Sequence, residues 1–149
     1  MSSAIYYFSE VDSTNNEAKK LIEEQKIKQG LVISKFQTKG RGRFGNKWIS
    51  QKGNFFSSFF FSVNNYSQVS QIQFKALKLV IKVISKYIEK KTLVIKYPND
   101  ILIKEKKISG ILVESFKLQK KFTLSWALEL ILLKTLVSKL TKRPIFIEK

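Results

Sequence analysis

The sequence predicts a single α+β domain in which short strands are interrupted by two helices. At 149 residues and 44% hydrophobic content, the chain is large enough to bury one core and too apolar to be disordered. Short runs rich in β-branched and aromatic residues recur along it, separated by turn residues. Between two of these runs, apolar residues repeat with a helical period.

The first half is expected to contain three strands and one helix. Ser13 or Thr14 is placed to cap a helix running to about residue 25, because each side chain can accept a hydrogen bond from a backbone N–H. Apolar runs predict strands at residues 5–11, 31–37 and 55–63.

The second half is expected to contain a helix, a short strand and a hairpin. Apolar residues recur at helical spacing over residues 69–88, with lysines facing outward. Residues 93–97 predict a short buried strand, and residues 101–104 and 107–116 predict the two strands of the hairpin. Gly110 interrupts the second of these strands, which suggests a bulge or a ligand close to the backbone.

Composition limits the chemistry and the location of the protein. The chain has no cysteine and no histidine, which excludes disulfides, Cys/His zinc sites and histidine-dependent catalysis. The N-terminus lacks a basic region followed by an apolar core, and no apolar run reaches membrane-spanning length. We therefore expect a cytoplasmic protein without a membrane partner.

The net charge of +17 allows two interpretations. A basic domain that binds nucleic acid without catalysis is one of them. However, nearly all the excess is lysine spread evenly along the chain, together with many Ile, Asn and Phe residues, as a strongly AT-rich genome would encode. We favour coding bias, and expect acidic or phosphate-bearing partners to be attracted at low salt.

Residues 37–48, here called the glycine loop, carry the strongest local signal. Gly40, Gly42 and Gly45 fall within it, and Arg41 and Arg43 flank the middle glycine. Glycines let a backbone approach a ligand, and arginine can grip phosphate or carboxylate with two parallel hydrogen bonds. The spacing alone fits an anion-binding loop and a mobile surface hairpin equally well.

Three further motifs are ambiguous when each is taken alone. Residues 12–15 (Asp-Ser-Thr-Asn) can simply cap a helix. Residues 97–100 (Tyr-Pro-Asn-Asp) can form a turn, orient a ligand or hold Mg²⁺ through oxygen. Lys107 begins an otherwise apolar strand, either as a solvated strand end or as a cation facing a phosphate.

In this order and spacing, the four motifs resemble the catalytic domain of bacterial biotin protein ligases. The resemblance implies a class II synthetase-like domain, a mixed and mostly antiparallel sheet flanked by helices. It implies that biotin and Mg-ATP give biotinyl-5′-AMP, and that the acyl group then passes to a lysine of a biotin carboxyl carrier protein. Mg²⁺ would arrive with ATP, since no cluster of residues in the sequence predicts a metal site. A lipoate or other acyl ligase on the same scaffold is the alternative.

The resemblance also implies residue roles. The expected catalytic residues are Lys107, Arg43 and Arg41. The expected nucleotide-side residues are Trp48, Lys96, Asn99 and Asp100. The expected biotin-binding residues are Ser13, Thr14, Asn15, Gln37, Arg41, Gly42, Arg43, Lys107 and Gly110. No helix-turn-helix segment precedes residue 5, so no DNA partner is expected.

The C-terminal part departs from this pattern. The resemblance extends to about residue 116, and residues 117–149 form an atypical tail within the one domain, 1–149. With AT-leaning codons, residues 126–136 read from the third codon position give Gly-Ile-Gly-Ile-Asn-Phe-Ile-Lys-Asn-Pro, the motif that such ligases carry there. We therefore expect a truncated or frameshifted chain, with the frameshift near residues 117–125 and inactivity as one outcome. An amphipathic helix over residues 128–140 is the alternative.

Overall fold

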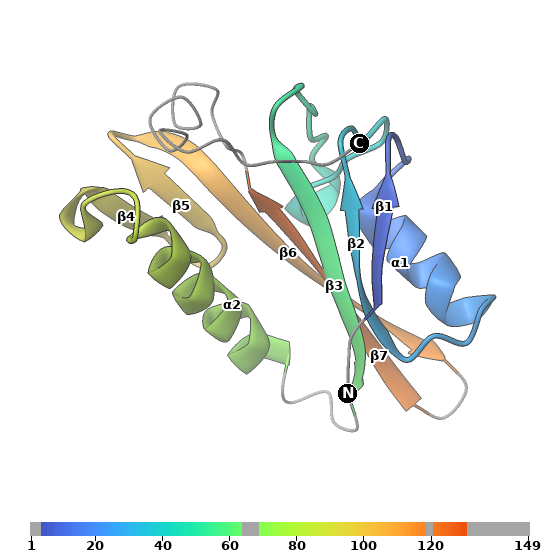
Figure 1. The fold of residues 1–149 in the computed structure, drawn as a ribbon. Coiled ribbons are helices and arrows are strands. Elements are labelled where there is room, and N and C mark those ends of the chain that lie inside the picture. Colours follow the sequence, from blue (N-terminus) through green and yellow to red (C-terminus); the bar gives the residue numbers. More distant parts are fainter. Residues whose placement is uncertain (1–3, 64–68, 119–120, 131–149) are drawn as a thin grey trace.

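A seven-stranded sheet forms the centre of the protein in a computed structural model that describes residues 4–63, 69–118 and 121–130 (Figure 1). The strand order is β1-β2-β3-β7-β6-β5-β4; β1 and β2 are parallel and every other pair is antiparallel. The strands are β1 (Ala4–Phe8), β2 (Gln29–Ser34), β3 (Phe55–Val63), β4 (Leu93–Lys96), β5 (Asp100–Ile103), β6 (Lys106–Leu118) and β7 (Lys121–Leu130). The predicted α+β class with a mixed, mostly antiparallel sheet is confirmed.

Two helices, α1 (Thr14–Glu23) and α2 (Val69–Ile84), cover opposite faces of this sheet (Figure 1). Along β6, Ile111 packs in the cluster under α2, whereas Phe116 packs against the cluster under α1. Because successive side chains of a strand alternate between its faces, this odd spacing separates the two clusters. We call the two sides the α1 face and the α2 face.

Each helix buries an apolar stripe. Under α1, Ala18, Leu21 and Ile22 pack against Val32 and Phe60, all at most 3% exposed. This burial removes apolar surface from water and fixes α1 against β2 and β3. Under α2, the cluster consists of Ala76, Leu77, Val80, Ile84, Ile101, Ile108 and Ile111.

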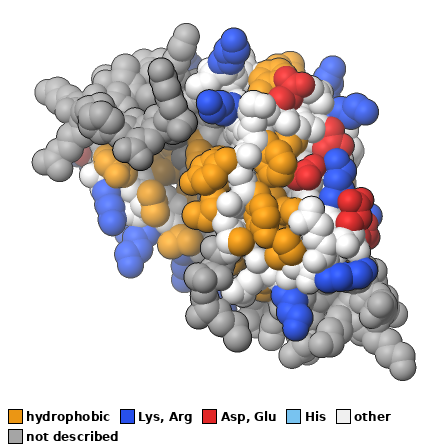
Figure 2. Space-filling view, turned by 45° about the vertical axis from the view of Figure 1, so that its right-hand side comes forward, with side chains coloured by type: hydrophobic (Ala, Val, Ile, Leu, Met, Phe, Trp, Pro, Cys, Tyr) orange, Lys and Arg blue, Asp and Glu red, His pale blue; other side chains and the backbone are white. Residues whose placement is uncertain are grey.

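The α2 face of β1–β3 is not covered by any described helix. Tyr7 is 72% exposed, Ile5 is 51% exposed and Phe59 is 36% exposed. Figure 2 shows hydrophobic side chains gathered over this part of the molecule. In the described part of the chain, α2 therefore covers only the other half of the α2 face and leaves the half formed by β1–β3 uncovered.

Most element boundaries agree with the sequence-based expectations. Residues 55–63 form β3 as predicted, while α2 ends at Ile84 rather than residue 88. The strand expected at 31–37 ends at Ser34, and Gln37 instead forms an isolated parallel bridge with Val11. The hairpin of β5 and β6 turns through Lys104 and Glu105, which both have positive φ. Two short 3₁₀ helices, η1 (Arg43–Gly45) and η3 (Lys90–Thr92), complete the described elements.

The part of the tail that the structure describes is a strand. We expected an atypical tail from residue 117, but β6 continues to Leu118 and β7 pairs with both β6 and β3. The physical reason is an alternation of large apolar and smaller or polar residues over 122–130, which suits a half-buried strand. Of the alternative helix over 128–140, residues 128–130 lie in β7, and the remainder is outside the described residues. No helix in the described part of the chain is long and apolar enough to span a membrane.

Candidate functional site

The glycine loop folds as a hairpin between β2 and β3. The Gly42 N–H donates to the Asn46 carbonyl at 2.7 Å, and the Trp48 N–H donates to the Gly40 carbonyl at 3.0 Å. A Cβ at Gly40 would lie 3.1 Å from Gln37 Nε2 and 3.2 Å from the Trp48 carbonyl oxygen. Glycine is therefore what allows the start of the loop to pass between these two residues.

One end of the loop joins a buried polar group, the α1 cluster, formed by Thr14, Asn15, Gln37 and Ser58. Thr14 donates to Gln37 Oε1 from its backbone N–H at 2.8 Å and from its hydroxyl at 3.1 Å. The Ser58 hydroxyl lies 2.7 Å from Thr14 Oγ1 and 2.9 Å from Asn15 Oδ1. These four side chains are at most 6% exposed, so the hydrogen bonds replace contacts with water.

Ser13 occupies the cap position of α1 but does not cap it. Its backbone is extended and its side chain makes no capping hydrogen bond. Gln37 takes part of this role, because its Oε1 accepts from the N–H of Thr14, the first helical residue, whereas the Asp12 carboxylate accepts from the Ser13 N–H and from Asn16 Nδ2. The buried Ser13 hydroxyl is thus not used to start the helix.

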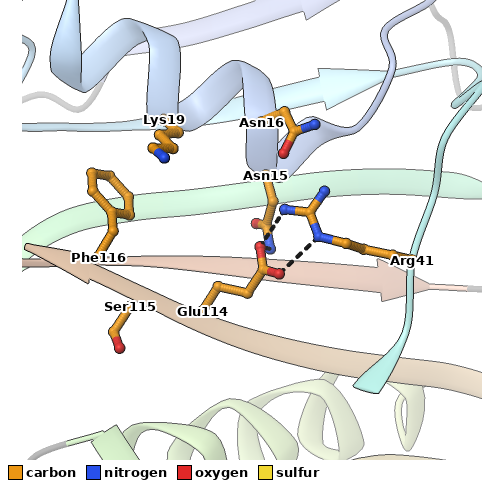
Figure 3. Close-up of a pocket in the computed structure, with 7 residues that line it drawn as sticks. All are labelled: Asn15, Asn16, Lys19, Arg41, Glu114, Ser115 and Phe116. Carbon is orange, nitrogen blue, oxygen red and sulfur yellow. Dashed lines mark hydrogen bonds and ion pairs between the residues drawn. The ribbon is translucent and has the colours of Figure 1, made fainter. Parts of the chain in front are cut away.

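Arg41 ties the loop to this cluster through Glu114 of β6 (Figure 3). Arg41 Nε donates to Glu114 Oε1 at 2.8 Å, and Nη2 donates to Oε2 at 2.7 Å. Asn15 Nδ2 donates to the same Oε2 at 2.7 Å. The hydrogen bond to Glu114 raises the pKa of Arg41, with burial acting in the opposite direction. The three residues line a cleft of about 350 Å³, together with Asn16, Lys19, Ser115 and Phe116.

The other end of the loop lies against a second group, the lysine cluster, formed by Arg43, Trp48, Asn99, Asp100 and Lys107. Lys107 Nζ lies 2.7 Å from Asp100 Oδ1 and 4.3 Å from the centre of the Trp48 ring. Asn99 donates to Asp100 at 2.8 Å and accepts from Arg43 Nη1 at 3.3 Å. The indole N–H of Trp48 is buried and has no hydrogen-bond partner among the described residues.

Gly110 makes room for Lys107. A Cβ at Gly110 would lie 2.9 Å from both Cε and Nζ of Lys107. The register between β5 and β6 shifts next to it, between Ile101 and Leu102. The sequence suggested a bulge or a close ligand at Gly110; the bulge is beside it, and the close neighbour is the Lys107 side chain.

Both clusters lie on the α1 face. Gly110 and Glu114 are four residues apart on β6, so a Cβ at Gly110 would point to the same side as the Glu114 side chain. The backbone of β7 pairs with this part of β6, with Glu129 in register with Gly110 and Ala127 in register with Leu112. The glycine loop therefore spans two polar groups on one face of the sheet.

The structure brings most of the predicted site residues together. Lys96 is the exception: its backbone pairs with Asp100, but its side chain is exposed and forms no ion pair with that carboxylate. Phe44, in the same loop, is 91% exposed. The sequence analysis gave no role to Ser58 or Glu114; the available signal was a serine pair inside a phenylalanine-rich strand and a lone acid in an apolar one.

No described residues form a ready-made metal site. Among the parts of the chain that the structure describes, there is no group of three or more Asp, Glu, His or Cys side chains close enough to hold a metal ion. The oxygen donors beside Lys107 are the side chains of Asn99 and Asp100.

Comparison with known proteins agrees with this arrangement. The profile of the biotin/lipoate A/B protein ligase family matches residues 7–129. Biotin–protein ligase 2 of Arabidopsis thaliana is 36% identical over 100 residues, which cover 64% of this chain and 30% of that protein. The chain thus spans about a third of the length of the curated relatives that it matches.

Two solved structures share the fold. Biotin protein ligase from Aquifex aeolicus, in complex with biotin and ATP, is 28% identical with a TM-score of 0.59, and the match covers 84% of this chain and 51% of that one. Biotin protein ligase from Leishmania major, in complex with biotin, has a TM-score of 0.72 at 23% identity, and the match covers 86% of this chain and 57% of that one. The fold is that of a biotin protein ligase catalytic domain, and the chain belongs to the biotin/lipoate A/B protein ligase family.

Proposed function

We propose that this protein attaches biotin to a lysine of a biotin carboxyl carrier protein, with ATP as the second substrate and biotinyl-5′-AMP as the intermediate. The observation that carries the proposal is the lysine cluster. Lys107 lies over the Trp48 ring and Arg43 donates to Asn99, and the glycine loop that carries Arg43 and Trp48 also reaches the buried α1 cluster through Gln37.

The first step joins two anionic groups. An oxygen of the biotin carboxylate attacks the α-phosphorus of Mg-ATP, a new P–O bond forms, and pyrophosphate leaves. Fixed cations reduce the repulsion between carboxylate and phosphate and stabilise the charge that develops on the phosphoryl oxygens. Lys107 and Arg43 are placed for this role, and no nucleophilic side chain is needed. Their positions before binding are set by Asp100 and Asn99.

The second step transfers the acyl group. The amine of the carrier lysine attacks the acyl carbon of biotinyl-5′-AMP, AMP leaves with the C–O bonding electrons, and the nitrogen loses a proton. The mixed anhydride must be kept from water until the lysine arrives, and a loop that covers the site reduces hydrolysis. The glycine loop contributes residues to both clusters.

The two ends of the site differ in charge, which favours one orientation of biotin. At the α1 cluster, the charge of Arg41 is neutralised by Glu114, and the surrounding groups are amides and hydroxyls. At the lysine cluster, two cations face one carboxylate. A ligand with a neutral polar ring and an anionic tail fits with its ring at the α1 cluster and its tail at Lys107.

Biotin-dependent ATP–pyrophosphate exchange tests the proposal directly. The assay uses two proteins: this chain, and a frame-restored version in which the residues after 116 are translated from the shifted reading frame. Each protein is assayed with biotin, with lipoate and with neither. Exchange that depends on biotin in either protein supports the proposal. Exchange that responds to lipoate alone assigns the site to another acyl group, and no exchange in a folded, frame-restored protein refutes the ligase activity.

A further inference from the structure

The solvent side of α2 carries positive charge that no described acidic residue balances. Helix α2 contains three lysines and no acid, whereas the two lysines of α1 pair with Glu17 and Glu23 of their own helix. A fourth lysine follows in the turn after α2. None of the four forms an ion pair with a described residue; they are Lys75, Lys78, Lys82 and Lys86.

Large apolar side chains lie beside these lysines on the same exposed surface. Hydrogen bonds from the N–H groups of Ser85 and Ile88 to carbonyls four residues back continue the helical spacing past the end of α2. Residues four apart are neighbours along a helix, so this side consists of two adjacent rows. We call them the apolar row (Lys75, Leu79, Val83 and Tyr87) and the cationic row (Phe74, Lys78, Lys82 and Lys86).

The apolar row is unusual for a surface helix, which normally presents polar side chains to water. Leu79 is 61% exposed, Val83 is 46% exposed and Tyr87 is 62% exposed. In the cationic row, Lys78 Nζ lies 4.4 Å from the centre of the Phe74 ring. Neighbouring exposed apolar side chains mark a contact surface, and here lysines border them along the whole length of the row.

Charge and apolar surface together indicate which partner fits. A second copy of this chain carries the same net charge of +17 and would be repelled. A nucleic acid would pair its phosphates with the lysines but would leave the apolar row in water. An anionic lipid surface offers charged head groups to the lysines and hydrocarbon to Leu79 and Val83, and tyrosine suits the boundary between the two.

We propose that α2 binds an anionic membrane surface, with the cationic row at the lipid head groups and the apolar row at their boundary with the acyl chains. A helix of this kind lies on the lipid and needs no spanning segment. The sequence analysis expected no membrane partner from spanning length alone. Because α2 lies on the opposite face of the sheet from α1, this contact leaves the α1 face and both polar clusters open (Figure 1).

Sedimentation with lipid vesicles tests the proposal. The full chain is mixed at low salt with vesicles of phosphatidylcholine alone, or with vesicles that also contain phosphatidylserine. We expect binding to the mixed vesicles only. A variant that combines Lys78→Gln, Lys82→Gln and Lys86→Gln should lower the partition coefficient by about 100-fold, since each lysine near an anionic surface contributes about fivefold.

Three exposed lysines outside α2 provide a matched control: Lys28, Lys35 and Lys52. Changing all three to glutamine removes the same charge and should lower binding by less than about fivefold. Equal losses in the two triple variants would show that only net charge matters, which overturns the proposal, as does failure of the parent to bind the mixed vesicles. Arginine at the three α2 positions should retain binding, which separates loss of charge from loss of the fold.

A change in the apolar row distinguishes lipid from nucleic acid. Leu79→Gln combined with Tyr87→Gln should weaken binding to the mixed vesicles by about tenfold or more, because two apolar side chains no longer leave water. Both positions are exposed, so the fold should keep its stability. Unchanged vesicle binding in this variant overturns the apolar contact. Binding to double-stranded DNA without binding to vesicles assigns the cationic row to nucleic acid instead.

The membrane contact and the ligase activity can fail separately. Vesicle binding without biotin-dependent exchange would refute the proposed function and leave the membrane contact standing. Exchange without vesicle binding would do the reverse.

Discussion

The ammonium of Lys107 pairs with the carboxylate of Asp100, with Nζ and Oδ1 2.7 Å apart. It lies in the space beside Gly110 that a Cβ at this position would enter. This pair keeps a cation on the α1 face near the start of β6, next to the buried Ile108. A ligand anion would compete with Asp100 for the same ammonium. The geometry thus gives the Lys107 ammonium a defined position between Asp100 and the Trp48 ring.

Removal of the Lys107 charge should reduce the adenylation rate strongly. We expect Lys107→Met to lower kcat for biotin-dependent exchange by about 10²–10³-fold, the usual loss when one fixed transition-state contact is removed. The measurement is the exchange assay, with the melting temperature followed by circular dichroism. Lys91→Met is the control, since Lys91 is exposed and, among the described residues, pairs with its near neighbour Glu89. Similar rates in the two variants would contradict the role of Lys107.

Two glycine substitutions should have opposite consequences. In Gly110→Ala the new Cβ meets the flexible end of Lys107, so the lysine can move and the fold should keep its stability. In Gly30→Ala it would lie 2.7 Å from the buried Phe60 ring and 3.1 Å from the Ala4 carbonyl oxygen, which cannot easily yield. We expect Gly30→Ala to lose about 1–3 kcal/mol in urea unfolding.

Gly110→Ala should instead lose exchange activity, by about tenfold or more, because the displaced ammonium no longer meets the phosphoryl oxygens. Its unfolding midpoint should stay close to that of the parent. Activity at the parental level would show that the position of Lys107 is not critical.

The Ser58 hydroxyl should contribute to stability because it is fully buried between two polar partners. Ser58→Ala removes the hydroxyl next to Thr14 Oγ1 and Asn15 Oδ1, one of which accepts its single hydrogen, and burial of an unpaired polar group costs about 1–3 kcal/mol. Urea denaturation measures the loss. Ser115→Ala on β6 is the comparison, since Ser115 is exposed and should change the unfolding free energy by less than about 0.5 kcal/mol. Equal values for both variants would exclude the buried hydrogen bonds as the cause.

Stability should depend on pH through Asp12 at the start of α1. Burial acts to raise the pKa of this carboxyl, but hydrogen bonds from Asn16 and Ser13 and the charges of Lys20 and Lys39 bring it below its ordinary value of 3.8. A lowered folded-state pKa adds stability above the unfolded value, and this contribution is lost as pH falls through the folded-state pKa.

The stability difference between the parent and Asp12→Asn should therefore be present at neutral pH and disappear as pH falls below 3.8. It should be less than about 1 kcal/mol, because the carboxylate is partly solvated. Unfolding followed by circular dichroism across this range measures it. A difference that grows on acidification would have the wrong sign for this account.

The amino-acid sequence alone predicted every described strand except β7, both α-helices and a set of candidate site residues. Periodicity located β3 to the residue and α2 to within a few residues, since apolar spacing follows directly from which face is buried. The order of four motifs supplied the family resemblance, which the match over residues 7–129 confirms. The departure at residue 117 led us to miss β7, although the alternation over 122–130 was already visible in the sequence.

Only the tertiary structure decided how these residues combine. The sequence could not show that Glu114 receives Arg41 from 73 positions away, or that Ser58 joins Thr14 and Asn15, because such contacts depend on strand register and on which side chains share a face. It also could not show that the Lys107 side chain lies in the space that a Cβ at position 110 would enter. Local pattern fixes the elements, whereas long-range pairing across the sheet places the charges.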